Sequence, residues 1–211
     1  MIQFLVVLFA VTLLYVSITG RIETYIKLLF LQGLFIFLIV TIESPVLNSL
    51  NYIFLMVETL GFKTIIIPLI LVKAVRKMVV RREVEPYILN FNSLLITTLI
   101  MVCSFILAFM SLKYAPQIKP VHFAVSISAV LTGLFIIMSR KKIITHIVGF
   151  IIMENGIFLL SLSIAGEMPL VVNLGVLLDI FIGIFLLVMV LKRIHSTFDE
   201  IHIDKLTHLT D

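Results

Sequence analysis

The sequence predicts an all-α polytopic membrane protein with about seven transmembrane helices, and three observations support this prediction. The chain has 211 residues, of which 61% are hydrophobic and 13% are charged, a composition typical of membrane proteins rather than soluble domains. Apolar segments long enough to span a bilayer recur along the whole chain. Basic residues gather in alternate connections between these segments. We therefore expect one integral membrane domain over residues 1–211.

Each apolar segment approaches the length of about 20 residues that a membrane helix needs. The segments are about 1–19, 25–42, 48–72, 93–112, 120–138, 143–165 and 170–191. No basic residue precedes the first, and no small-residue cleavage site follows it, so we expect a transmembrane helix rather than a signal peptide. The spans divide into a four-helix part, 1–112, and a three-helix part, 120–194, followed by a cytoplasmic tail, 195–211.

The distribution of lysine and arginine predicts the orientation. With seven spans, 13 of the 16 basic residues fall on one side of the membrane, Lys113 and Lys119 fall on the other, and Lys63 lies within a span. Because cytoplasmic connections hold the excess of positive charge, we expect the N-terminus outside and the C-terminus in the cytoplasm. The same bias explains the net charge of +4 without a nucleic-acid partner. The basic 73–92 connection then meets anionic lipid head groups or, alternatively, docks a cytoplasmic protein.

The first two spans are plain apolar helices whose notable interior residues are Gln32 and Gly33. The third is less ordinary. Pro68 removes the backbone hydrogen bond to residue 64 and should bend this helix. Lys63 lies near mid-span, too far from either end for its ammonium to reach the interface.

Two interpretations of Lys63 stay open. It is either a protonatable group on a polar path, facing a second subunit, or a lysine satisfied by Glu58 or by a carbonyl of a kinked helix. Glu58 and Lys63 lie about 140° apart around a regular helix, so they pair only if the helix is bulged or broken near Gly61. We expect Glu58 itself to be structural.

Small and weakly polar residues in the next spans predict helix packing. Thr97, Thr98, Cys103 and Ser104 are weak packing groups in the fourth span, and Ser126, Ala129 and Gly133 form a small-residue stripe in the fifth that favours close helix contact. His146 adjoins a basic connection, and we expect an interfacial residue there rather than a proton relay.

The most informative stretch runs from Gly149 to Gly183, where two apolar segments each carry one acid. The turn at 166–169 makes them an antiparallel hairpin, which places Glu154 and Asp179 at similar depth, both roughly 17–20 Å from the same end. Acids at this depth cost about 2.5–3.5 kcal/mol each and indicate a functional site by default. The alternative is that each acid is protonated and merely hydrogen-bonded to a neighbouring helix.

We therefore predict a site for proton or ion translocation. Its main residues are Glu154, Asp179 and Lys63, and its supporting residues are Glu58, Asn155, Asn173 and His146. A catalytic centre in this chain is not expected, because there is no Walker loop, dinucleotide fingerprint or metalloprotease motif. The single Cys103 cannot hold an iron–sulfur cluster or a structural zinc. We expect no metal or cofactor in the chain.

Residues 120–211 resemble the small K subunit of respiratory complex I, which has three helices and one buried acid in each of the last two. Gly149, Met153 and Asn155 match its second-helix motif, Asp179 matches its third-helix acid, and the tail His202-Ile203-Asp204 is similar to its ending. One position departs from this pattern. The family has its second-helix acid where this chain has Ile151, and Glu154 lies about one turn later, on the same helix face.

The whole chain resembles component E of hydrogenase-4, a type of group 4 nickel–iron hydrogenase found in formate hydrogenlyase-like complexes. The matching pieces are Met153-Glu154-Asn155-Gly156, Asp179, Lys63 and Pro68-Leu69. The resemblance implies a non-catalytic membrane-arm subunit in a prokaryotic cytoplasmic membrane. It also implies antiporter-like neighbours, a peripheral hydrogenase arm, and nickel–iron and iron–sulfur centres in those partners. These would drive proton or sodium translocation.

Two other functions stay open. The same helices would suit a multi-subunit monovalent cation/proton antiporter without a redox partner, although its K-like subunit normally has about three helices. They would also suit a structural scaffold in which the acids only lock helices together. The coupling ion, the electron donor and the direction of ion flux do not follow from the sequence.

Overall fold

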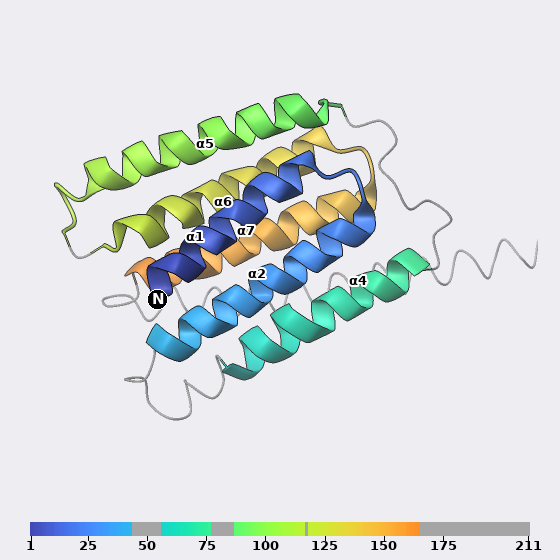
Figure 1. The fold of residues 1–211 in the computed structure, drawn as a ribbon, viewed down its shortest axis with the longest axis horizontal. Helices are drawn as coiled ribbons and strands as arrows, with labels where there is room; N and C mark the ends of the chain where they lie inside the picture. Colours follow the sequence, from blue (N-terminus) through green and yellow to red (C-terminus); the bar gives the residue numbers. More distant parts are fainter. Residues whose placement is uncertain (44–55, 77–86, 117, 165–211) are drawn as a thin grey trace, which may run out of the picture.

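The computed structural model describes residues 1–43, 56–76, 87–116 and 118–164, and these form an all-helical bundle (Figure 1). Its elements are α1 (Ile2–Ile18), α2 (Ile22–Glu43), η1 (Glu58–Ile66), α4 (Ile67–Arg76), α5 (Asn90–Ser111), α6 (Pro120–Ser139) and α7 (Ile143–Ile164). Within these described residues four helices, α2, α5, α6 and α7, are long and apolar enough to cross a membrane, and α1 is a shorter apolar helix. The predicted span at 170–191 lies outside the described residues. The count of seven and the orientation stay predictions.

The helices pack side by side, and short connections join α1 to α2 and α6 to α7 (Figure 1). Among the described helices, α6 and α7 share the most extensive interface, and α1 packs against α2, α5 and α6. α2 contacts α1, η1, α4 and α7, which makes it the neighbour of every helix that bears the site described below. α5 and α4 lie at opposite edges of the bundle (Figure 1).

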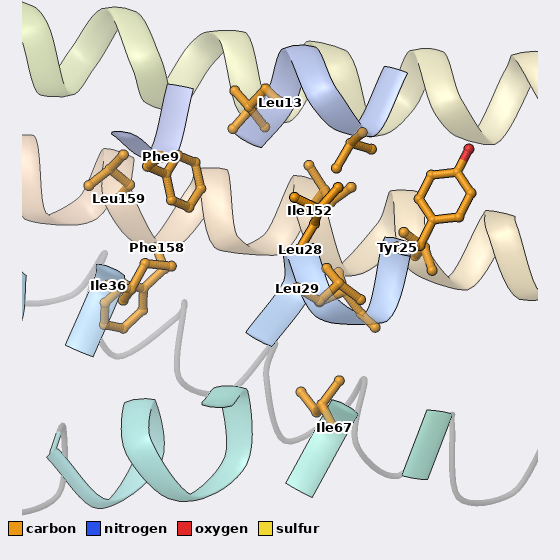
Figure 2. Packing of buried hydrophobic residues seen from close by; sticks show 14 of the residues in the cluster. Phe9, Leu13, Tyr25, Leu28, Leu29, Ile36, Ile67, Ile152, Phe158 and Leu159 are labelled. Carbon is orange, nitrogen blue, oxygen red and sulfur yellow. The ribbon is translucent and has the colours of Figure 1, made fainter. Parts of the chain in front are cut away.

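Apolar side chains fill the space between the helices. A contiguous cluster takes residues from α1, α2, α4, α6 and α7. Figure 2 shows part of it, including Phe9 and Leu13 of α1, Ile36 of α2 and Phe158 of α7. Such interdigitated packing fixes helix positions, because dense interiors tolerate little displacement.

Many large apolar side chains lie on the surface of the bundle, and α5 shows this clearly. Its buried residues are the small or polar Ser93, Thr97, Ser104 and Ala108, whereas Leu99, at 63% exposure, and Phe109, at 58%, point outward. Water would disfavour such a surface, but lipid matches it. Thr97 and Ser104 pack inward as predicted. Thr98 and Cys103 are exposed, so they are not packed against another helix of the described chain.

Small residues bring α6 and α7 into backbone contact. A Cβ added at Gly133 would lie 2.5 Å from the carbonyl oxygen of Gly149, and a Cβ at Gly156 would lie 2.8 Å from the backbone nitrogen of Val130 and from the Cβ of Ala129. At these distances a side chain at either position would force the two helices apart. The predicted stripe of Ser126, Ala129 and Gly133 is thus confirmed as a close helix contact, which is how membrane helices associate when the hydrophobic effect is weak.

The third predicted span contains a π-helix instead of a simple bend. η1 runs from Glu58 to Ile66 and continues directly into α4, and the Ile67 N–H donates to the Phe62 carbonyl, five residues back. Pro68 follows at once. Because proline has no N–H and its ring crowds the carbonyl four residues earlier, a wider turn before it relieves the clash. The π-helix buries Glu58, Thr59, Lys63 and Thr64.

Arg140 ties three helices together at one end of the bundle. Its side chain is 1% exposed. Nη1 donates to Asn90 Oδ1 at the start of α5 (3.1 Å), and Nη2 donates to the carbonyl of Ser17 at the end of α1 (2.8 Å). The sequence predicted a basic connection here. The structure shows that Arg140, one of its charged residues, is buried and links the helices.

Replacing Arg140 with lysine is expected to lower the stability of the purified chain by about 1.5–3 kcal/mol, the range for hydrogen bonds to charged groups. A single ammonium lacks the planar fork that reaches both acceptors. Thermal unfolding in mild detergent measures the loss. The matched control is Arg21→Lys, since Arg21 is exposed. Equal melting temperatures for the two variants would contradict the link.

Candidate functional site

A buried ion pair joins η1 to α7. Lys63 Nζ lies 2.6 Å from Glu154 Oε1, and both side chains are 2% exposed. Glu154 is the twelfth of the 22 residues of α7, so the pair lies near the middle of a predicted span. The residues are 91 apart in sequence. Two opposite charges at 2.6 Å compensate one another where isolated charges would be strongly disfavoured.

Two further groups of α7 surround the ammonium. Asn155 Oδ1 lies 3.5 Å from Lys63 Nζ, and the ring of Phe158 lies 4.5 Å below it, measured to the ring centroid. An aromatic face attracts a cation by its quadrupole. Lys63 is thus held by a carboxylate, an amide oxygen and an aromatic ring, all from α7.

Asn155 is oriented in turn by α2 and α1. Its Nδ2 donates to Gln32 Oε1 (3.3 Å), Gln32 Nε2 donates to Thr12 Oγ1 (2.9 Å), and Thr12 donates to the carbonyl of Phe9 (2.6 Å). Every donor in this chain points away from Lys63. Because the Asn155 amide nitrogen is engaged by Gln32, its oxygen must face the ammonium. The polar chain therefore fixes acceptor geometry around Lys63 and ends at a backbone carbonyl of α1.

Glu154 keeps one oxygen outside these contacts. Its Oε2 is buried and has no hydrogen-bond partner among the described residues. A carboxylate has acceptor sites on both oxygens, so Oε2 is the position at which this group can accept a proton while Oε1 faces Lys63.

Replacing Gln32 with leucine is expected to destabilise the chain by about 1–3 kcal/mol, because it leaves the Asn155 amide buried without its acceptor. Thermal unfolding in detergent measures this effect. Gln3→Leu is the matched control, since Gln3 is exposed on α1. A Gln32→Leu protein as stable as the control would show that these hydrogen bonds contribute nothing to the stability of the protein.

The structure brings together three of the seven residues predicted for the site: Lys63, Glu154 and Asn155. Asp179 and Asn173 lie outside the described residues. Glu58 is buried at the start of η1, and the structure places the carboxylate of Glu154 against Lys63; a contribution of Glu58 to holding this lysine stays a prediction. His146 is half-buried at the start of α7, where its Nε2 donates to the carbonyl of Arg140 (2.6 Å); its place at the membrane interface stays a prediction.

Sequence reasoning did not include Gln32, Thr12 or Phe158 in the site. A signal existed for Gln32, since a buried amide in an otherwise apolar helix needs partners. Thr12 and Phe158 carry no such signal, because threonine satisfies itself on its own helix and phenylalanine is ordinary in a membrane span. Within the described residues no group of three or more His, Cys, Asp or Glu is placed to hold a metal ion.

Comparison with known proteins gives distant relatives. The chain is 28% identical over 149 residues to hydrogenase-4 component E of Escherichia coli and of Shigella flexneri, a match that covers 70% of this chain and 68% of each relative. It is 25% identical over 156 residues to an uncharacterised protein of Mycobacterium tuberculosis, covering 74% of this chain and 71% of that protein. No family model matches, and no solved structure is significantly similar. Hydrogenase-4 component E is thus a distant homologue, which supports the predicted family; the resemblance to a K subunit stays a prediction.

Proposed function

We propose that this protein is a non-catalytic membrane-arm subunit of a complex I-like respiratory hydrogenase, and that its Lys63–Glu154 pair takes part in proton or sodium translocation. The observation that carries the proposal is this ion pair, buried near mid-span in a homologue of a hydrogenase component. Ionisable residues inside membrane proteins mark ion pathways by default. The chain's apolar surface suits a bilayer and membrane partners.

The pair couples protonation to movement. As Lys63⁺ and Glu154⁻ it has no net charge, so a proton added to Glu154 leaves an uncompensated cation in a low-dielectric interior. The cost of this uncompensated cation is removed when the ammonium moves away from the protonated carboxyl group or gives up its own proton. Proton arrival at Oε2 and displacement of Lys63 from Oε1 are therefore linked events.

The hydrogen-bond chain through Asn155 and Gln32 positions side chains and does not conduct protons. Side-chain amides relay protons poorly, because each would have to pass through an unfavourable tautomer, and every donor already points one way toward Phe9. Protons therefore enter and leave on the side of Glu154 Oε2. Asp179 is the proposed second station, with Asn173 as a support, and Glu58 and His146 keep structural roles.

Energy for translocation comes from partner subunits. The proposed partners are antiporter-like membrane subunits and a peripheral arm that holds nickel–iron and iron–sulfur centres, in a prokaryotic cytoplasmic membrane. Homology to hydrogenase-4 component E supports membership in such an assembly, and a formate hydrogenlyase-like complex is the proposed type.

A tagged purification of this protein from its native host in mild detergent, with mass spectrometry of co-purifying chains, tests the assembly. We expect nickel–iron and iron–sulfur subunits together with antiporter-like membrane subunits. Antiporter-like subunits without a metalloprotein would replace this function by a cation/proton antiporter. The chain alone, intact and stable, would contradict both and leave the ion pair a helix lock.

A further inference from the structure

Gly33 of α2 touches the backbone of η1 at the residue that bears the ammonium. A Cβ added at Gly33 would lie 3.0 Å from the carbonyl carbon and oxygen of Lys63 and 3.0 Å from the Cα of Thr64. These neighbours are backbone atoms, which cannot rotate away as a flexible side chain does. Any side chain at position 33 would therefore push η1 away from α2.

α2 contributes to the site through two adjacent residues. Gln32 orients the amide of Asn155, the acceptor beside Lys63, and Gly33 sets how closely η1 approaches. The two positions lie about 100° apart around the helix, which suits contacts with two different neighbours, α7 and η1. The wide π turn around Lys63 presents its backbone to this contact.

We propose that Gly33 is a positioning residue for the Lys63–Glu154 pair: its missing side chain sets the spacing between α2 and η1 that brings Lys63 Nζ to Glu154 Oε1. This proposal rests on the proposed function for its effect on transport, but its effect on the pair itself is independent of that function. Lysine has a flexible stem, yet here the ammonium meets the carboxylate, the Asn155 oxygen and the Phe158 ring at once. A shift of its backbone changes the distances from the ammonium to these three groups together, and thus weakens the pair.

The chain offers a matched control for the substitution Gly33→Ala. Gly61 lies within the same π-helix, and a Cβ there meets no atom within 4 Å in the described structure. Gly61→Ala makes the same chemical change and the same gain in helix propensity without pressing on a neighbour. The difference between the two variants isolates the effect of the contact at Gly33.

The first measurement is the melting temperature of the full chain in detergent, in two backgrounds. One background has the native pair, and the other is the double variant K63M/E154Q. We expect Gly33→Ala to lower the melting temperature more in the native background, by a surplus of about 3 °C or more, because only there does it also weaken the pair. Gly61→Ala should shift both backgrounds equally. A variant that fails to fold with the native pair but folds in the double-variant background would give the same result in a stronger form.

An equal loss in both backgrounds, or failure to fold in both, would overturn the proposal, since Gly33 would then act through packing alone. The second measurement is ion translocation by the intact complex. We expect Gly33→Ala to reduce it about threefold to tenfold, since a misplacement of about 1 Å costs about a hundredfold. If Glu154→Gln leaves translocation intact, the proposed function fails, and the melting comparison still decides the role of Gly33.

Discussion

Replacing Lys63 with methionine or Glu154 with glutamine is expected to destabilise the chain by about 3–5 kcal/mol each, whereas the double variant K63M/E154Q should recover most of that loss. Removing one partner of a buried pair leaves an uncompensated charge, and removing both leaves none. The pair at 2.6 Å and 2% exposure meets the condition for this asymmetry. Thermal unfolding of the four proteins in one detergent measures the coupling between the two positions.

This comparison of four proteins, a double-mutant cycle, needs one control, and one outcome would contradict the expectation. Glu23→Gln makes the same acid-to-amide change at an exposed position in the first turn of α2, and we expect it to be neutral. Strictly additive losses, with the double variant the least stable of the set, would show that Lys63 and Glu154 do not compensate one another in the folded chain.

The second large effect is expected at the α6–α7 crossing. Gly133→Val should prevent the protein from accumulating in folded form, because its Cβ alone would lie 2.5 Å from the Gly149 carbonyl oxygen and 2.6 Å from the Met153 backbone nitrogen. Gly133→Ala should cost about 1–3 kcal/mol or more, the range for overpacking in a filled interior. Expression in membranes and size-exclusion chromatography in detergent separate these outcomes.

Gly61→Ala is the control for this series as well, since a Cβ there is free of contact in the described structure. A folded, monodisperse Gly133→Val protein would contradict the close crossing. The expected ranking, with Gly61→Ala neutral, Gly133→Ala intermediate and Gly133→Val worst, follows from the added volume at one point of backbone contact.

Much of this architecture follows from local pattern. The helices α5, α6 and α7 begin and end within a few residues of the predicted spans, because a bilayer-length apolar run can satisfy its backbone only as a helix. The small-residue stripe from Ser126 to Gly133 predicted the close contact between α6 and another helix for an equally local reason. Small residues at helical spacing leave room for a second backbone whatever that backbone is.

The pairing of Lys63 did not follow from local pattern. Its partner lies 91 residues away, and the helix between Glu58 and Ile66 has π geometry, which rotates Lys63 relative to a regular helix. Arg140 shows the same limit. From the sequence, a basic residue next to a helix end is expected to lie at the membrane interface. Only the tertiary structure shows Arg140 buried against the end of α1 and the start of α5.

Ion translocation by the intact complex carrying K63M/E154Q tests the central claim most directly. The double variant removes both charges while keeping most of the stability, so the complex is expected to assemble. The assay uses vesicles that turn over hydrogen, with proton and sodium movement measured separately. We expect the number of ions translocated per hydrogen to fall at least about tenfold. A positioned proton-transfer group contributes about a hundredfold or more to a rate, so a tenfold fall is a conservative threshold. Glu23→Gln should match the unmodified complex. Undiminished translocation by an assembled K63M/E154Q complex would contradict the account and leave Lys63 and Glu154 as a structural lock between η1 and α7.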